Sequence, residues 1–167
     1  MRKQYLKIRQ KKSMDSILQA GKKAPAFKGK DQDGTTVSLA DFKGKKLALF
    51  FYPKDNTPGC TAQACDLRDN IAALQKEGIV VIGISADDEK SHKKFETKHH
   101  LPFKLVADVD RKIIEAYGVW GPKKFMGREF DGIHRTTFLI NEKGVIDHVI
   151  TKVKTKEHAS QILSLWK

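Results

Sequence analysis

The chain has 167 residues, of which 40% are hydrophobic and 31% are charged, and its formal net charge is +12 at pH 7. This length fits one domain with a sizeable core, and the apolar share argues against disorder. No apolar run approaches the roughly 18 to 20 residues of a membrane span, so we expect one folded domain and no contact with a membrane.

Half of the net charge lies at the start of the chain. Residues 1–13 carry six Lys and Arg and no Asp or Glu, and without them the formal charge falls to +6. Three interpretations stay open: a disordered tail, a translation start placed too early with Met14 as the true beginning, or an organelle-targeting segment, the first two being favoured. We therefore divide the chain into a basic, disordered extension, 1–13, and a single domain, 14–167.

The remaining composition indicates where the protein works. No secretory signal core is present, which predicts a cytoplasmic location and a reducing environment for the two cysteines. The other Lys residues are mixed with Asp and Glu, and no aromatic residues are interleaved with them. This is typical of a solvated surface, so we expect no specific binding of nucleic acid.

The first half of the chain alternates between strand and helix patterns. Residues 24–39 contain two extended pieces around the turn-forming residues 31–34, which predicts a β-hairpin. Residues 47–52 are nearly all apolar, as in a central strand covered on both faces. Apolar residues at steps of three and four then predict one helix that Cys60 opens and Gly78 ends.

The second half continues the alternation and ends in a hairpin and a helix. Residues 79–84 predict a second buried strand, and Asp87 or Asp88 can cap a polar helix toward His99. A short extended piece (103–106) and a short helix (111–117) follow, and then a hairpin of strands 136–140 and 145–150. Thr155 is predicted to cap a final helix.

These elements predict an α/β protein with a thioredoxin-like fold. Strand and helix units in alternation, followed by a hairpin and a closing helix, fit a mixed central sheet with helices on both faces and an N-terminal β-hairpin. Because one fold hosts many functions, the function has to be argued from the site.

The chemistry of the chain is concentrated between the first central strand and its helix. Residues 52–65 contain both cysteines, and Cys60 stands where a helix begins. Free N–H groups and the partial positive charge of a helix N-terminus favour a thiolate, the reactive form of cysteine. Pro53 and Pro58 restrict the loop, and Gly59 allows a small substrate to approach the backbone.

The spacing of the two cysteines predicts a conformational change. Five positions apart on an α-helix, Cys60 and Cys65 are about 140° apart in rotation and about 7.5 Å apart along the axis. A disulfide needs Cα atoms within about 7 Å and converging side chains, so an intact helix cannot form one. We therefore expect the helix to unwind locally after Cys60 is oxidised, so that Cys65 reaches it.

The loop resembles the active-site signature of a known family. Pro53-x-x-x-Thr57-x-x-Cys60 is similar to the peroxiredoxin motif, and the stretch from Thr57 to Cys65 resembles the Q, or bacterioferritin comigratory protein, subfamily. The resemblance runs from about residue 16 to residue 167. Further matching stretches are residues 21–27, 118–121, 125–127 and 132–140.

The resemblance implies a role for each residue of the motif. Cys60 would be the peroxidatic nucleophile and Cys65 the resolving thiol, joined afterwards in an intramolecular disulfide. Thr57 would offer its hydroxyl to the thiolate and the peroxide, Pro53 would shield the site from water, and Arg135 would keep the thiolate ionised. The protein would be a thiol peroxidase, a monomer that reduces hydrogen peroxide and organic hydroperoxides and is recycled by thioredoxin or a similar dithiol.

Alternative hypotheses remain beside this one. Cys60 could be a structural thiol on an apolar helix face, Cys65 an incidental cysteine, and Arg135 a surface ion-pair partner. The protein could be a general thiol-disulfide oxidoreductase of thioredoxin type, although it lacks Cys-x-x-Cys, or a basic binding module. We expect no cofactor and no metal, because two cysteines without a suitably spaced His make a poor zinc site.

Overall fold

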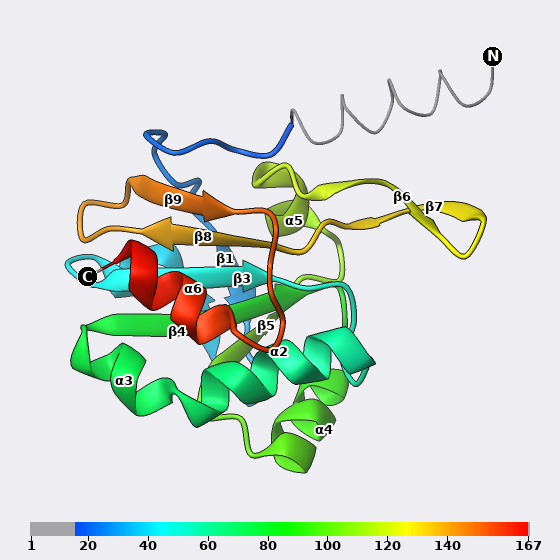
Figure 1. Cartoon of the computed structure of the whole chain (residues 1–167), viewed down its shortest axis with the longest axis horizontal. Helices are drawn as coiled ribbons and strands as arrows, with labels where there is room; N and C mark the ends of the chain where they lie inside the picture. Colours follow the sequence, from blue (N-terminus) through cyan, green and yellow to red (C-terminus); the bar gives the residue numbers. More distant parts are fainter. Residues whose placement is uncertain (1–15, 167) are drawn as a thin grey trace.

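The computed structural model describes residues 16–166, and its centre is a seven-stranded mixed sheet (Figure 1). The strands lie in the order β2, β1, β5, β4, β3, β8, β9. Their bounds are β1 Lys28–Lys30, β2 Thr36–Ser38, β3 Lys46–Phe51, β4 Ile79–Ser85, β5 Lys104–Ala107, β8 Thr136–Ile140 and β9 Ile146–Ile150. The predicted hairpins are confirmed, since β1 pairs with β2 and β8 with β9, both antiparallel.

Strand β3 lies at the centre of this sheet. It pairs parallel with β4 on one side and antiparallel with β8 on the other. Leu49 and Phe51 belong to one hydrophobic core, whereas Ala48 and Phe50 belong to the other. The apolar run therefore forms a strand that is covered on both faces, as predicted.

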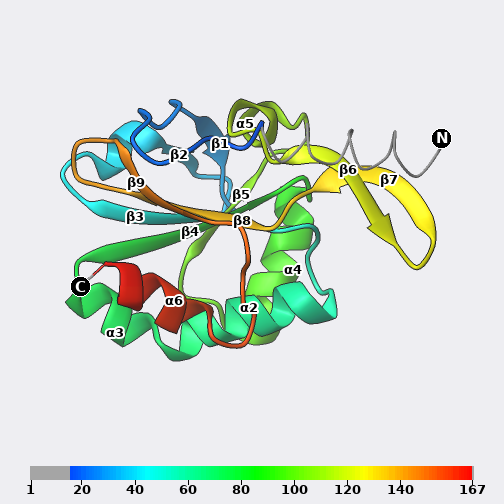
Figure 2. The same ribbon diagram turned by 45° about the horizontal axis from the view of Figure 1, so that its top comes forward.

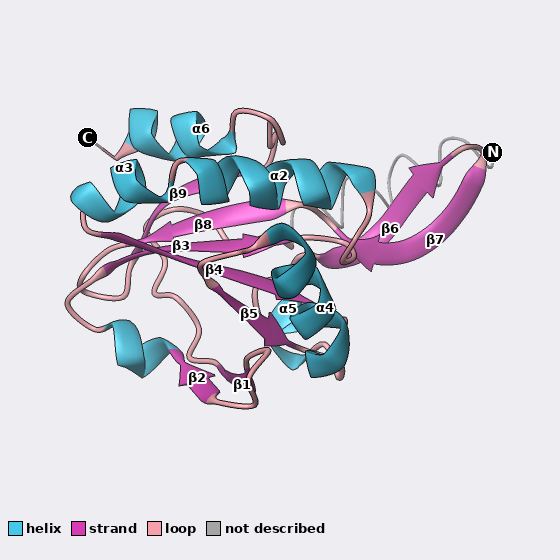
Figure 3. Cartoon of the chain, turned by 90° about the horizontal axis from the view of Figure 1, so that it is seen from below, coloured by secondary structure: helices cyan, strands magenta, loops and turns pink. Residues whose placement is uncertain are grey.

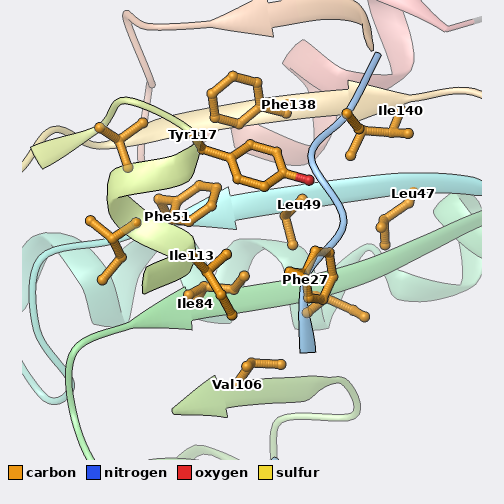
Figure 4. Close-up of a cluster of buried hydrophobic side chains, with 14 of the residues drawn as sticks. Phe27, Leu47, Leu49, Phe51, Ile84, Val106, Ile113, Tyr117, Phe138 and Ile140 are labelled. Atoms are coloured by element: carbon orange, nitrogen blue, oxygen red, sulfur yellow. The ribbon is translucent and has the colours of Figure 1, made fainter. Parts of the chain in front are cut away.

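The first core lies under the N-terminal segment, the 3-10 helix η1 (Leu39–Phe42) and helix α5 (Lys112–Ala116). Figure 4 shows Tyr117, just after α5, between Phe51 and Phe138. Its ring centroid lies 5.3 Å from that of Phe51 and 5.1 Å from that of Phe138. These aromatic contacts fix α5 against β3 and β8.

Four helices cover the opposite face of the sheet (Figures 2 and 3). They are α2 (Pro58–Asp69), α3 (Ile71–Lys76), α4 (Glu89–His99) and α6 (His158–Leu165). Leu67 of α2, Phe95 of α4 and Ile162 of α6 share the second core. The mixed sheet with helices on both faces is the thioredoxin-like arrangement that the sequence predicts.

The structure corrects two helix boundaries. The predicted single helix after Cys60 ends at Asp69, because the Asn70 side chain donates to the Asp66 carbonyl at 2.8 Å and competes with the helical hydrogen bonds. The predicted cap Thr155 is wrong. Glu157 is the N-cap of α6, since residues 154–157 form a turn in which the Glu157 N–H donates to the Lys154 carbonyl.

The sequence did not predict a third hairpin. Strands β6 (Trp120–Phe125) and β7 (Arg128–Ile133) form a separate two-stranded sheet that projects from the body (Figures 1 and 2). Its strands bury little, and Phe125 and Met126 at the tip are 67% and 87% exposed. Because only the base of this hairpin packs against the core, most of its residues lack the alternation of buried and exposed positions on which sequence-based recognition depends.

The structure does not test the predicted division of the chain after residue 13. The basic extension, residues 1–13, lies outside the described residues, so the division into 1–13 and 14–167 stays a prediction. Among the described residues, no helix is long and apolar enough to cross a bilayer.

Candidate active site

Cys60 lies in the first turn of α2, directly after the loop that leaves β3. Thr57 is the N-cap residue of this helix, and Pro58 occupies its first position, where a missing N–H costs nothing. The Cys60 side chain is buried, with only 2% of the residue exposed. The predicted placement of the thiol at a helix N-terminus is therefore confirmed, and the partial positive charge of the helix dipole lies close to its sulfur.

Arg135 lies in the short link between β7 and β8, and its guanidinium reaches Cys60. Nη2 donates a hydrogen bond to the Cys60 sulfur at 3.3 Å, although the two residues are 75 positions apart. Nη1 donates to Oε1 of Gln63 at 2.6 Å. The guanidinium is thus held by two partners on α2, and the interpretation of Arg135 as a mere surface ion-pair residue does not fit this geometry.

Gln63 is a site residue that the sequence analysis missed. It follows Cys60 by three positions, so it lies about one helical turn away on the same side of α2. Its side chain is fully buried, and Nε2 has no hydrogen-bond partner among the described residues. The spacing from Cys60 was a possible signal, but only the contact with Arg135 shows what Gln63 does.

Gly59 allows the guanidinium to come close to the helix. A Cβ at this position would lie 3.1 Å from Nη2 of Arg135, closer than side chains normally pack. From the sequence, we expected Gly59 to let a small substrate approach the backbone. The structure shows that Arg135 occupies part of it, so Gly59 lets the arginine reach Cys60.

Thr57 and Pro53 lie in the loop as predicted, but no hydrogen bond joins Thr57 to Cys60 in the described part of the chain. The Thr57 hydroxyl donates to the Lys54 carbonyl at 2.7 Å. A hydroxyl has one proton and two lone pairs, so in this arrangement Thr57 can accept a hydrogen bond from a peroxide. Pro53 is half-buried beside it.

Cys65 lies on the same helix as Cys60, and both are free thiols in this structure. Cys60 is buried, whereas Cys65 is half-buried. The helix is continuous from Pro58 to Asp69, so the two side chains point in different directions, as expected from their spacing. The reduced arrangement that the sequence predicts is the one observed.

Two further basic residues, Lys123 and His134, lie near Arg135. Burial lowers the pKa of Lys123, the nearby Arg135 lowers it further, and the charge of Cys60 acts in the opposite direction. Burial also lowers the pKa of His134, with Lys123 contributing. Lys123 is anchored by donating to the Ile133 carbonyl at 2.8 Å. Lys123 thus adds positive charge near the thiol.

One group of described residues has the residue types of a metal site. It consists of Asp55, Asp87 and His92, behind the catalytic loop. Their atoms already make hydrogen bonds within the protein: Asp87 accepts from the Ser85 hydroxyl at 2.6 Å, and the His92 Nδ1 lies 2.7 Å from Asp55. These residues therefore form a hydrogen-bond network that holds the loop, and we assign no metal to them.

Known proteins are similar to this chain over most of its length. The family model described as AhpC/TSA family matches residues 20–149. The putative peroxiredoxin bcp of Haemophilus influenzae is 51% identical over 87% of this chain and 94% of its own length. The peroxiredoxin Bcp of Escherichia coli is 48% identical over 88% of this chain and 94% of its own length.

The chain belongs to the Bcp peroxiredoxins of the AhpC/TSA family. A solved structure of the Xanthomonas campestris bacterioferritin comigratory protein, described as a trapped intermediate and ligand complex, is 34% identical with a TM-score of 0.77. The match covers 83% of this chain and 88% of that one. As a Bcp peroxiredoxin, this protein is a thiol peroxidase with a thioredoxin fold and a peroxidatic cysteine, which confirms the predicted family, fold and enzyme class.

Proposed function

We propose that Cys60 is the peroxidatic cysteine and that Cys65 resolves its oxidised form. The observation that supports this most directly is the hydrogen bond from Arg135 to the Cys60 sulfur. A guanidinium and a helix N-terminus both direct positive charge at this sulfur, and both favour the thiolate that attacks peroxides. Cys65 lies further along α2, away from its N-terminus, and among the described residues no hydrogen bond is donated to its sulfur.

In the first step, the Cys60 thiolate attacks the terminal oxygen of a hydroperoxide. The O–O bond breaks, the alkoxide or hydroxide leaves and takes a proton, and Cys60 becomes a sulfenic acid. The Arg135 donors stabilise the negative charge that moves from sulfur to oxygen. The Thr57 hydroxyl oxygen accepts a hydrogen bond from the O–H of the peroxide and so orients it. Pro53 keeps water from the thiol.

In the second step, the Cys65 sulfur attacks the sulfenic sulfur of Cys60. The S–O bond breaks, the hydroxyl leaves as water with the proton of Cys65, and an intramolecular disulfide forms. This requires the first turns of α2 to unwind, because the intact helix keeps the two sulfurs apart.

The substrates are a hydroperoxide and a thiol reductant. We propose which hydroperoxides and which kind of thiol these are. The Xanthomonas campestris relative is described by its alkyl peroxide reduction activity, which supports organic hydroperoxides beside hydrogen peroxide as substrates here. A dithiol such as thioredoxin returns the disulfide to two thiols by exchange. We further propose that the protein works as a monomer in the cytoplasm and uses no cofactor.

The roles of the two cysteines are tested by comparing Cys60→Ser with Cys65→Ser in stopped-flow peroxide consumption. Cys60→Ser should consume no peroxide, whereas Cys65→Ser should complete one turnover and stop at the sulfenic acid. Peptide mapping of the wild-type protein after one equivalent of hydrogen peroxide should show a Cys60–Cys65 link. Equal behaviour of the two variants would refute the assignment.

A further inference from the structure

The loop before α2 is held from below by a buried carboxylate. Asp55, only 5% exposed, accepts hydrogen bonds from the hydroxyls of Tyr52 at 2.6 Å and Ser91 at 2.8 Å. Nδ1 of His92 lies 2.7 Å from the same carboxylate. The backbone N–H of Asp55 donates to Asp87 at 2.9 Å. The loop is therefore tied both to α4 and to the end of β4.

His92 makes this anchor rigid. Its Nε2 lies 3.1 Å from the carbonyl of Val106 in β5. The imidazole is fully buried and bridges Asp55 to the sheet. Buried polar groups with every partner in place are costly to separate, so the loop before α2 keeps its position when neighbouring segments move.

A second anchor lies immediately after Cys65. Oδ2 of Asp66 accepts a hydrogen bond from the backbone N–H of Ala159 at 2.8 Å, at the start of α6, which lies beside α2 in Figures 1 and 2. Two positions on, Nη1 of Arg68 donates to the His99 carbonyl at the end of α4 at 2.7 Å. From residue 66 onward, α2 is thus tied to two neighbouring helices.

Residues 58–65, between the two anchors, make fewer side-chain hydrogen bonds to other elements than the anchors do. In the described structure, the side-chain hydrogen bonds from residues 58–65 to other elements are the two with Arg135, made by Cys60 and Gln63. The remaining contacts are those of small side chains such as Ala64, which is buried but offers little apolar area. This segment is the part of α2 that can open at least cost.

We propose that the unwinding which joins Cys65 to Cys60 takes place in residues 58–65 and is limited behind them by Asp66, while Asp55 keeps the loop in front of them in place. The inference rests on the proposed function, because it concerns the disulfide step. Cys65 has to turn through about 140° to meet Cys60, and Asp66 is its direct neighbour, so the Asp66–Ala159 hydrogen bond resists this rotation. Asp66 therefore sets the rate at which the sulfenic acid is resolved.

Both aspartates act through other residues and touch no reacting atom. The covalent change stays the one described above: the sulfenic acid of Cys60 and the thiol of Cys65 give a disulfide and water. Asp55 positions the loop that carries Thr57 and Pro53 for the peroxide step. Asp66 positions Cys65 for the step that follows. The two residues should therefore affect different steps.

The Asp66 anchor is tested by rapid-quench mass spectrometry of disulfide formation after one equivalent of hydrogen peroxide. Asp66→Ala should accelerate this step about tenfold, the effect of losing one hydrogen bond to a charged group. Ala is a better helix former than Asp, so helix propensity alone predicts the opposite change. Asp66→Asn keeps an acceptor oxygen and should stay close to the wild type.

Asp69→Ala is the matched control, because it removes the same charge from the same helix. The Asp69 carboxylate is exposed and contacts only its neighbour Arg68 among the described residues. The rate of disulfide formation should not change in this variant. An unchanged rate in Asp66→Ala, or an equal acceleration in Asp69→Ala, would overturn the proposed role of Asp66.

The Asp55 anchor should give the complementary result. Asp55→Asn should slow sulfenic acid formation about tenfold and leave the disulfide step unchanged, because the loop loses its position while residues 58–65 open as before. If Asp55→Asn does not fold, His92→Gln tests the same anchor. Equal slowing of both steps by the Asp55 or His92 variant would overturn the proposal, whereas a wild-type protein that forms no internal disulfide would refute the proposed function instead.

Discussion

The sulfur of Cys60 receives positive potential from two directions. The N-terminus of α2 lies on one side, and the guanidinium of Arg135 donates to the sulfur from the other at 3.3 Å. Gln63 accepts from the second arm of that guanidinium and so fixes its plane. At the scale of single residues, the site therefore consists of a sulfur and a guanidinium donor whose orientation a second side chain fixes.

Replacing Arg135 by Lys should slow the peroxide step about 100-fold, although the charge is kept. An ammonium group cannot bond to Cys60 and Gln63 in one plane as the guanidinium fork does, and a lost donor of this kind costs about 100-fold or more. Stopped-flow kinetics of sulfenic acid formation measures this effect. Arg128→Lys, at an exposed position of β7, is the control and should react at the wild-type rate.

Replacing Gln63 by Leu should slow the reaction with peroxide and leave the free energy of unfolding nearly unchanged. The peroxide step should slow about tenfold because Arg135 loses the acceptor that orients it. The free energy of unfolding should change by less than about 1 kcal/mol, since the substitution also removes the buried, unpaired Nε2. A large loss of stability in urea titrations, with an unchanged peroxide rate, would show that Gln63 is a core residue only.

At the scale of elements, α2 joins catalysis to the core. Its first two turns carry both cysteines, and its last turns pack Leu67 into the core that α4 and α6 share. The break at Asn70 separates α2 from α3, so the helix that we propose to open is short. Part of α2 can therefore unwind while the rest keeps its packing.

Replacing Leu67 by Ala should lower the free energy of unfolding by about 2–5 kcal/mol. The residue is fully buried, and deleting its side chain leaves a cavity beneath the second half of α2. Denaturant titration monitored by circular dichroism checks this value. Leu165→Ala on α6 is a control of the same chemistry at an exposed position and should cost much less.

The helix α6 should make stability depend on pH through His158. Burial lowers the pKa of this imidazole, and Arg135 contributes, although Gln161 and Asp66 act in the opposite direction. The unfolded chain, with a His pKa of about 6.5, therefore takes up the proton first as the pH falls. The stabilisation is complete above about pH 6.5 and is lost as the pH decreases toward the lower, folded pKa.

His158→Gln removes this titrating group and keeps a side chain that can contact the Thr137 hydroxyl, 2.7 Å away in the structure. The free energy of unfolding, measured by urea titration from pH 8 to pH 5 with both cysteines reduced, should fall more steeply for the wild type than for the variant. Parallel curves for the two proteins would contradict the expected contribution of His158.

At the scale of the whole molecule, the sheet brings distant segments to one edge. Strand β3 lies next to β8, so the loop after β3 and the link before β8 meet, and with them Cys60 and Arg135. Lys123, in the middle of β6, donates to the Ile133 carbonyl and adds positive charge to the same region. The contact between Cys60 and Arg135 thus depends on the pairing of β3 with β8 in the sheet.

Removal of residues 1–13 should leave both the peroxide rate and the free energy of unfolding unchanged. The described contacts of Cys60, Arg135 and their partners all lie within the folded domain. The truncated chain should also show no binding to nucleic acid at physiological salt, because half of the net positive charge is gone. A loss of peroxidase activity would show that the domain begins before residue 14.

The sequence by itself determined the order of the main strands and helices and the place of Cys60 at a helix start, and it predicted that α2 has to open. These features are local: they depend on apolar periodicity, on turn residues and on the five-residue spacing of the cysteines. The family resemblance indicated Arg135 as well, but the residues around it gave no reason to choose it. Only its contact with Cys60 does so.

The tertiary structure alone decided the rest of the site. The partnership of Gln63 with Arg135, the Asp55–His92 anchor and the Asp66–Ala159 hydrogen bond each join residues from different elements or depend on one that does. The end of α2 at Asn70 and the projecting β6–β7 hairpin also escaped the sequence analysis. Contacts between distant segments follow from how the sheet and helices pack, and no local pattern in the chain encodes them.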